Sequence, residues 1–218
     1  MPDMTADSSA TVADPTSAVR KRPKRGERRE QILQTLASML EQPGAERVTT
    51  AGLAARLEVS EAALYRHFAS KAQMFEGLID FIESAAFSLV RQISETGQEA
   101  DNEPAAASRK AARIVAMLLQ FAEKNPGMAR VMVGDALVFE NERLHQRMSL
   151  FFDKIESELR QTLRLASAHN GSAAPTADAN LTASLLTAFL VGRMQRFTRS
   201  GFKKLPTEQL DGCLQRLL

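Results

Sequence analysis

Apolar residues recur at steps of three and four along most of this chain, from Glu27 to the C-terminal end. This spacing places them on one face of an α-helix. No stretch alternates polar residues with Val, Ile or Thr in the period-2 pattern that is typical of strands. Pro and Gly fall mainly between the helical segments, where they end helices. The sequence therefore predicts an all-α fold.

The predicted helices form a short N-terminal group and a longer C-terminal group. Residues 96–108 and 169–174 are polar and contain Gly or Pro, so we expect loops there. No apolar run approaches the ~18 residues that a membrane helix needs. We expect helices at 27–41, from 49, at 61–67, 70–95, 109–124, 127–133, 135–139, 141–168 and 177–200, and a short one after Pro206.

The net charge of +2 is unevenly distributed. Residues 20–30 carry seven basic and two acidic side chains, whereas residues 1–19 are polar and poor in large apolar groups. We interpret residues 1–25 as a disordered basic arm. Such an arm indicates a polyanionic partner, although it would also serve simply to keep the protein soluble. Residues 1–19 also lack the apolar core of a secretory signal, so we expect a cytoplasmic protein.

The segment from Val48 to Lys71 carries the strongest local signal. A helix begins near Thr49, buries Leu53 and Ala54, and ends before a turn that Val59 plugs. The next helix has Ser60 as its expected cap and turns Leu64 and Phe68 toward the core. Two short helices with this spacing predict a helix-turn-helix, with the helix at 61–67 as the element that enters the major groove of DNA.

The side chains that this arrangement leaves off the core are the predicted DNA contacts. Small residues at the start of the recognition helix let its backbone approach base edges, and an Ala methyl can contact a thymine methyl. Side chains with hydrogen-bond donors hold phosphates on either side and fix the register. The predicted contacts are Arg28, Thr49, Thr50, Ser60, Glu61, Ala62, Ala63, Tyr65, Arg66, His67 and Lys71.

The run Tyr65-Arg-His-Phe-x-Ser-Lys71, after a Thr-led helix and a Val-Ser turn, resembles the TetR family of bacterial regulators. The resemblance implies a helix-turn-helix domain at 26–70 and a helical regulatory and dimerisation domain at 71–218. One position departs from the family, which usually has Gly where Glu58 stands. A non-Gly residue in a left-handed turn costs on the order of 1 kcal/mol, so either Glu58 bears that strain or the turn differs.

Matches beyond this domain resemble one branch of the family, the SlmA-type nucleoid occlusion factors. The matching stretches include Met74-Phe75, Phe121-x-Glu-x-Asn-Pro-Gly127, Ala136-Leu-x-Phe-Glu140 and Arg196-Phe-x-Arg-Ser-x-Phe-Lys203. The resemblance implies a nucleoid-associated homodimer on palindromic double-stranded DNA. It also implies a groove on the regulatory domain that holds the C-terminal tail of the division protein FtsZ and so antagonises its polymerisation.

Helical spacing suggests residues for such a groove on two successive helices, where an apolar trough with a cation at its rim would suit a short peptide. Each apolar member would equally serve as core, whereas Gln120 and Lys124 are better suited to the groove. The predicted groove residues are Phe81, Ile82, Ala85 and Leu89 on the first helix and Met117, Gln120, Phe121 and Lys124 on the second.

Two further apolar stripes predict a four-helix dimer interface, in which Gly192 would permit close approach. The alternative is a bundle within one subunit. A dimer is favoured because one recognition helix binds too few base pairs for useful specificity. The stripes are Leu144, Met148, Phe151, Ile155, Leu159 and Leu163, and then Leu181, Leu185, Ala188 and Gly192.

Other functions find little support in the sequence. The three His residues lie far apart, Cys213 is the only cysteine and no Gly-rich phosphate loop is present. We therefore expect no enzyme, no metal and no cofactor. A small-molecule-responsive repressor is the main alternative, with the 11 Phe residues available to line a pocket. A non-specific nucleoid protein is a third, which the small side chains on the recognition helix disfavour.

Overall fold

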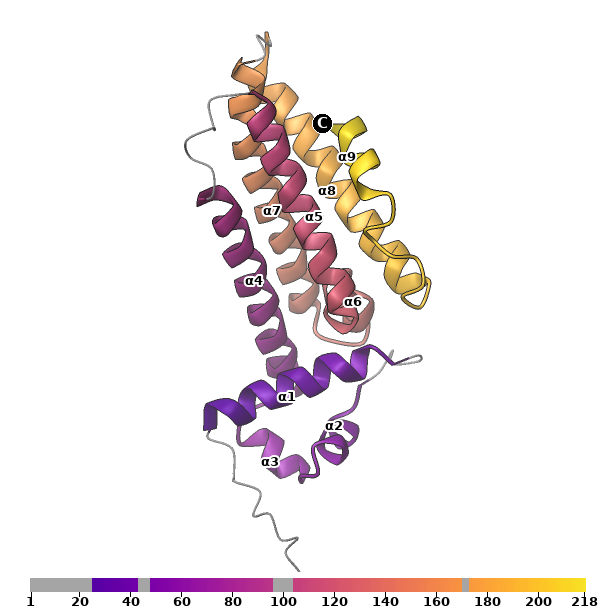
Figure 1. The fold of residues 1–218 in the computed structure, drawn as a ribbon. Coiled ribbons are helices and arrows are strands. Elements are labelled where there is room, and N and C mark those ends of the chain that lie inside the picture. The colour runs from indigo at the N-terminus through magenta and orange to yellow at the C-terminus, as the bar shows by residue number, and fades with distance from the viewer. Residues whose placement is uncertain (1–24, 43–47, 96–103, 170–172) are drawn as a thin grey trace, which may run out of the picture.

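The computed structural model describes residues 25–42, 48–95, 104–169 and 173–218, and no strand occurs within these ranges (Figure 1). The all-α prediction is confirmed, whereas the basic arm lies almost entirely outside the described residues. The helices are α1 (Arg25–Leu40), α2 (Thr50–Arg56), α3 (Glu61–Tyr65), α4 (Lys71–Glu95), α5 (Pro104–Lys124), α6 (Pro126–Met132), the 3₁₀-helix η1 (Asp135–Leu137), α7 (Glu142–His169), α8 (Pro175–Arg199) and α9 (Leu210–Leu217).

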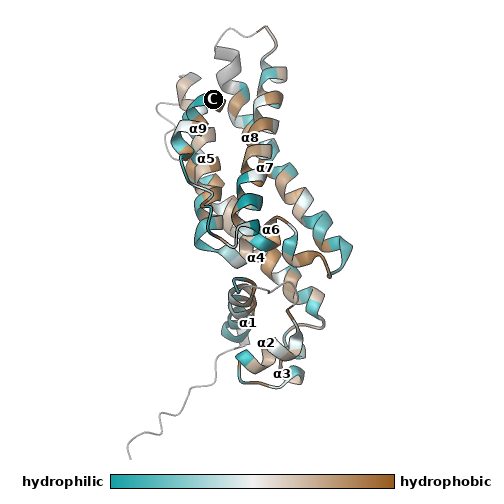
Figure 2. Ribbon diagram, turned by 90° about the vertical axis from the view of Figure 1, so that its right-hand side faces the viewer, coloured by the Kyte–Doolittle hydropathy of each residue, from teal (hydrophilic) through white to brown (hydrophobic). Residues whose placement is uncertain are grey.

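The helices form a small N-terminal unit and a larger bundle that share one apolar core. Helix α1 lies between α2 and α3 on one side and the bundle on the other (Figures 1 and 2). Helix α4 leaves the small unit and runs up beside α5 and α7, while α8 and α9 complete the far side. The buried cluster is continuous from Leu36 and Phe68 in the small unit, through Ile82, to Phe197 in the bundle. Within the described residues, no helix is long and apolar enough to cross a membrane.

Three expected helices have different bounds or a different type in the structure. Helix α5 begins at Pro104, within the loop expected at 96–108, because Pro is well suited to a first helical turn and the following Ala residues favour helix. The recognition helix α3 ends at Tyr65 instead of continuing to His67, so its last two expected residues form a turn. The helix expected at 135–139 is a three-residue 3₁₀-helix that follows a left-handed Gly134.

Ion pairs hold α4 against α7. Arg147 Nη2 lies 2.8 Å from Asp80 Oδ1 and 2.9 Å from Glu83 Oε2, and Lys154 Nζ lies 4.0 Å from Glu83 Oε1. Burial acts to lower the pKa of Arg147, but the carboxylates of Asp80 and Glu83 outweigh it, so the pKa is raised above its ordinary value. The guanidinium therefore stays charged, and these pairs fix the position of α4 along α7.

The small unit docks on the bundle through an unusually close contact between α1 and α6. A Cβ added to Gly127 of α6 would lie 2.0 Å from the carbonyl oxygen of Ala37 and 3.2 Å from the Cβ of Leu40. Neither neighbour can give way freely, because one is helix backbone and the other is buried. Only glycine lets the two helices approach this closely.

Replacing Gly127 by Ala is therefore expected to lower the free energy of unfolding by about 1–3 kcal/mol, as overpacking of a tight core does. Urea denaturation followed by circular dichroism measures the change. Gly26→Ala is the matched control, because nothing lies within 4 Å of the position that its Cβ would occupy. A Gly127→Ala protein as stable as the control would show that the α1–α6 contact is looser than described.

Candidate nucleic-acid interface

The helix-turn-helix forms from local interactions that the sequence predicts. Thr49 caps α2, because its Oγ1 accepts a hydrogen bond of 3.1 Å from the backbone N–H of Gly52. The backbone N–H of Val59 donates to the carbonyl of Ala54 at 3.0 Å and closes the turn. Glu58 has a left-handed φ of 54°. The residue that replaces the usual Gly thus adopts the left-handed conformation, at a cost on the order of 1 kcal/mol.

Helix α3 presents one face to solvent. Leu64 and, just beyond the helix, Phe68 are buried and hold this segment on the core. Glu61, Ala62, Tyr65 and Arg66 are exposed on the outer side. Ser60 makes no side-chain capping bond, contrary to expectation, so its hydroxyl is not engaged in holding the helix.

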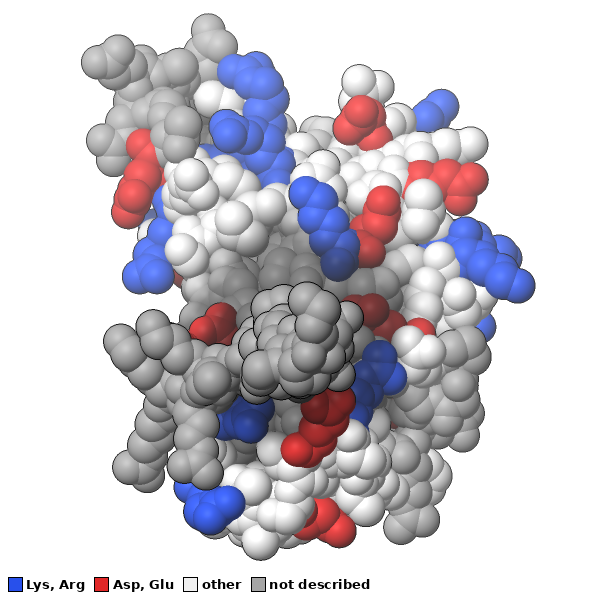
Figure 3. Space-filling model, turned by 60° about the horizontal axis from the view of Figure 1, so that its bottom comes forward, with Lys and Arg blue, Asp and Glu red and all other residues white. Residues whose placement is uncertain are grey.

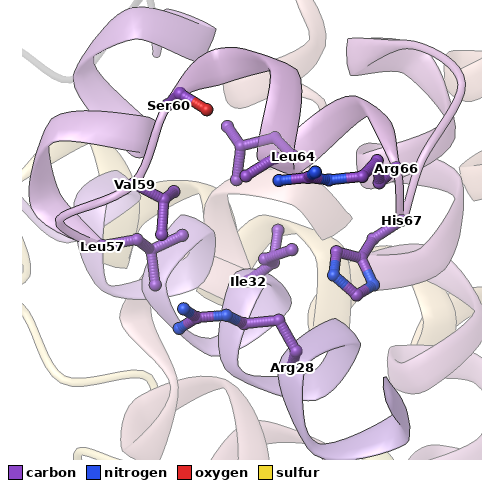
Figure 4. Close-up of a pocket in the computed structure, with 9 residues that line it drawn as sticks. Arg28, Ile32, Leu57, Val59, Ser60, Leu64, Arg66 and His67 are labelled. Atoms are coloured by element: carbon purple, nitrogen blue, oxygen red, sulfur yellow. The ribbon is translucent and has the colours of Figure 1, made fainter. Parts of the chain in front are cut away.

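Five of the predicted contacts surround one pocket on the α1 side of this face. The cavity has a volume of about 510 Å³ and an apolar floor that includes Ile32, Leu57 and Val59. Arg28 reaches it from α1, while Arg66 and His67 approach it from the end of α3 (Figure 4). Ser60 and Ala63 complete the lining from the start and middle of the recognition segment. The pocket thus brings together hydrogen-bond donors from sequence positions 28 to 67.

On the α2 side, two predicted contacts bind each other. Thr50 Oγ1 donates to Glu61 Oε2 at 2.6 Å, across the junction between α2 and α3. The pair joins the first turns of the two helices and fixes the Glu61 carboxylate on the exposed face of α3. Glu61 is thereby held in place as an acceptor.

Arg29 performs a role that sequence reasoning missed. Its Nη1 donates to the carbonyl of His67 at 3.0 Å, and its guanidinium lies 4.2 Å from the centre of the Phe68 ring. In the sequence Arg29 is one basic residue among seven, and nothing in its neighbours distinguishes it. The contact fastens the end of the recognition segment to α1.

Lys71 has a partner that the sequence did not predict. Its ammonium forms a close ion pair with Glu140, whose side chain is only 10% exposed, and lies 5.7 Å from the Phe75 ring. In this structure Lys71 joins the start of α4 to the segment before α7, so it is not placed among the free phosphate donors. A partner 69 residues away in the sequence could not be foreseen from local pattern.

The described surface at this end carries mixed charge. Figure 3 shows Lys and Arg side chains spread over it and interspersed with carboxylates, without one continuous basic patch. The densest basic segment of the sequence, at residues 20–25, lies outside the described side chains. Within the described residues, no group of three His, Cys, Asp or Glu could hold a metal ion.

A second cavity of about 510 Å³ lies between α4 and α5. Met117 and Gln120 line it, as predicted for a peptide groove, together with Gln92, Ile93, Arg113 and Ala116, which were not predicted. Ile82 is fully buried and belongs to the core, so its assignment to the groove is withdrawn. Phe121 is partly buried and packs on the core, whereas Lys124 is exposed at the end of α5. Phe81, Ala85 and Leu89 lie on α4 outside the cavity lining, with Phe81 47% exposed.

Comparison with protein families covers both halves of the chain. Residues 32–78 match the family described as bacterial regulatory proteins, tetR family. Residues 108–217 match a family described as SlmA-like, a tetracyclin repressor-like C-terminal domain. The first match covers the helix-turn-helix, and the second covers nearly all of the bundle beyond α4.

Similar proteins agree with both matches. Nucleoid occlusion factor SlmA from Vibrio cholerae is 48% identical over 84% of this chain and 90% of its own length. The same factor from Shewanella sediminis is 50% identical over 84% and 89%. Among solved structures, the fatty acid degradation regulator FadR from Bacillus halodurans has a TM-score of 0.69 at 17% identity, covering 91% of this chain and 96% of its own. AibR, solved with isovaleryl coenzyme A and operator DNA, has a TM-score of 0.66 at 14% identity over 87% and 97%. These two show a shared fold.

Proposed function

Because this chain belongs to the SlmA family of TetR-type bacterial regulators, we propose that it is a nucleoid occlusion factor. In this role it binds palindromic chromosomal sites as a dimer and, while bound, antagonises FtsZ polymerisation. Division-ring assembly is thereby blocked over the nucleoid. The observation that carries the proposal is the near-50% identity to such factors across both the DNA-binding unit and the bundle. The expected cytoplasmic, nucleoid-associated location follows from this role.

The DNA contacts divide between the two sides of α3. The exposed Ala62 on the outer face lets the helix enter the major groove, and Ala63 beside it adds little bulk. Arg28, Ser60, Arg66 and His67 would hold phosphates from the pocket side. Thr49 and Thr50 at the start of α2, and the exposed Tyr65 at the end of α3, would hold the opposite strand. Glu61 would accept a hydrogen bond from a cytosine amino group.

Of the two apolar stripes predicted to form the dimer interface, we retain only the one on α8. Leu181 and Leu185 are 66% and 57% exposed, and a Cβ added to Gly192 would meet nothing within 4 Å. Two solvent-exposed leucines on one face of a helix indicate a surface that binds a partner. The α7 stripe, by contrast, is buried in the core of the subunit from Leu144 to Leu163, so it is not available to a second copy.

The FtsZ tail would lie in the cavity between α4 and α5. Its walls combine the partly buried Met117 and Ala116 with the exposed cation of Arg113, and Lys124 stands further along α5. Apolar walls with cations at the rim suit a short peptide that carries both apolar and acidic side chains. We retain Phe81, Ala85 and Leu89 as candidates for an extension of this groove toward the DNA-binding unit.

Arg113→Glu is expected to weaken binding of a labelled FtsZ tail peptide about tenfold, because it places an anion on the groove rim, and tenfold corresponds to about 1.4 kcal/mol. Fluorescence anisotropy with and without palindromic DNA measures this. Lys203→Glu is the control, with the same charge change at an exposed site outside the cavity. A wild-type protein that binds DNA but never the peptide would be a repressor of the small-molecule-responsive type, and the proposed function would be lost.

A further inference from the structure

Helix α1 contacts the recognition segment near one end and the regulatory bundle near the other. Near its start, Arg29 binds the carbonyl of His67 and covers the Phe68 ring. Near its end, Ala37 and Leu40 pack against Gly127 of α6. Figures 1 and 2 show α1 lying between the two parts of the molecule. These contacts therefore connect the recognition segment through α1 to α6.

Arg130 is the charged part of the α1–α6 contact. Its Nη1 donates to the carbonyl of Leu40 at 3.2 Å and lies 3.4 Å from the carbonyl of Gln42. The last carbonyls of a helix lack intrahelical partners and form the negative end of its dipole, so a guanidinium is well matched to this position. The same guanidinium lies 5.5 Å from the centre of the Phe202 ring, which belongs to the segment after α8. Arg130 therefore ties the end of α1 to the bundle.

Helix α6 is in turn tied to the groove. It follows α5 after a single residue, Asn125, whose Nδ2 donates to the carbonyl of Phe121 at 2.8 Å. The backbone N–H of Asn125 donates to the same carbonyl at 3.1 Å. These two hydrogen bonds to one carbonyl fix the junction between α5 and α6, so a displacement of α6 would also move the last turn of α5. Lys124 belongs to that last turn, and Gln120, which lines the groove, lies directly before it in α5.

We propose that Arg130 is a positioning residue that couples the DNA interface to the α4–α5 groove through α1 and α6. The inference rests on the proposed function, because it concerns regulation of the proposed tail groove. By linkage, operator DNA then strengthens peptide binding by the same factor by which the peptide strengthens DNA binding. A population shift of this kind requires that each ligand favour one placement of α1 on α6.

Arg130→Met separates coupling from folding. Methionine keeps an unbranched stem for packing but removes the donors to Leu40 and Gln42. It also removes the Nε of Arg130, which is buried without a partner in the described structure, so the loss of folding stability is expected to be small. Arg193→Met is a closely matched control. Arg193 likewise donates to two backbone carbonyls, of Pro206 and Glu208, and lies 5.4 Å from the Phe189 ring, but its contacts are all within the bundle.

The palindromic duplex is first selected from a random pool of DNA by binding to the wild-type full-length protein. The experiment then measures the dissociation constant of the labelled FtsZ tail peptide with and without this duplex. We expect the duplex to strengthen peptide binding at least fivefold in the wild type and in Arg193→Met. In Arg130→Met we expect less than a twofold effect, while the affinity for duplex alone stays within threefold of wild type. The converse titration, of duplex with and without peptide, must give the same ratios.

Amide hydrogen exchange provides a second reading that does not depend on the peptide. Adding the duplex is expected to slow exchange in α6 and in the last turn of α5 in the wild type, but not in Arg130→Met. Unchanged exchange there in the wild type, or equal peptide affinity with and without duplex, overturns the coupling. If duplex strengthens peptide binding by the same factor in Arg130→Met as in the wild type, the proposed role of Arg130 is overturned. If the peptide never binds but exchange responds as expected, the coupling stands and the proposed function fails.

Discussion

A protein in which Tyr65 and Arg66 are both replaced by Ala is expected to lose about a thousandfold in operator affinity while it remains folded. Both side chains are exposed, with Tyr65 45% exposed, whereas Leu64 and Phe68 hold the segment on the core. A dimer loses four contacts to phosphates. At roughly 1–1.5 kcal/mol for each hydrogen bond, the total is about 4–6 kcal/mol, which corresponds to at least a thousandfold.

The salt dependence of operator binding is a second, independent test of the same double variant. Loss of the two Arg66 cations of a dimer should reduce the slope of log affinity against log salt by about 1.8, at roughly 0.9 for each phosphate contact. Arg91→Ala is the control, because it removes an exposed cation from α4, away from the small unit. Electrophoretic mobility shifts at several salt concentrations measure both quantities. Unchanged operator binding by the double variant would mean that α3 is not the recognition helix.

The helix-turn-helix was predictable because each of its determinants acts within a few residues. The Thr49 cap, the turn at Glu58 and Val59, and the buried Leu64 each depend on neighbours in the sequence. The ion pair of Lys71 was not predictable for the opposite reason: its partner, Glu140, belongs to another part of the fold. A local sequence motif predicts the backbone geometry of the helix-turn-helix, but it does not show that a distant carboxylate such as Glu140 pairs with Lys71.

Helical spacing identifies residues that share a face, but it does not identify the helix that covers that face. The α7 stripe through Phe151 was predicted to bind a second subunit, yet α5 and α8 pack against it within the same subunit. The same limit explains Ile82, which shares a face with the groove candidates but turns into the core. Arg113 and Ile93 entered the groove lining because α4 and α5 run antiparallel beside each other, a pairing that the spacing alone does not give.

The α8 stripe leads to the second large prediction. Replacing both Leu181 and Leu185 by Glu is expected to convert the protein to a monomer of 23.9 kDa. Both leucines are largely exposed within one subunit, so the substitutions leave its core intact. In a dimer they would bury four carboxylates at the interface, and burying charges without partners is strongly unfavourable. Sedimentation equilibrium measures the mass.

The same variant should lose operator affinity about a thousandfold, although no DNA contact has been altered. A monomer offers one recognition helix, and losing the second half-site brings binding down toward the non-specific level, which is typically at least 10³ weaker. Leu205→Glu is the control, because Leu205 is also an exposed leucine, at 48%, but lies beyond the end of α8. A double variant that remains dimeric would place the interface elsewhere. A monomeric variant with full operator affinity would show instead that one α3 is sufficient for recognition.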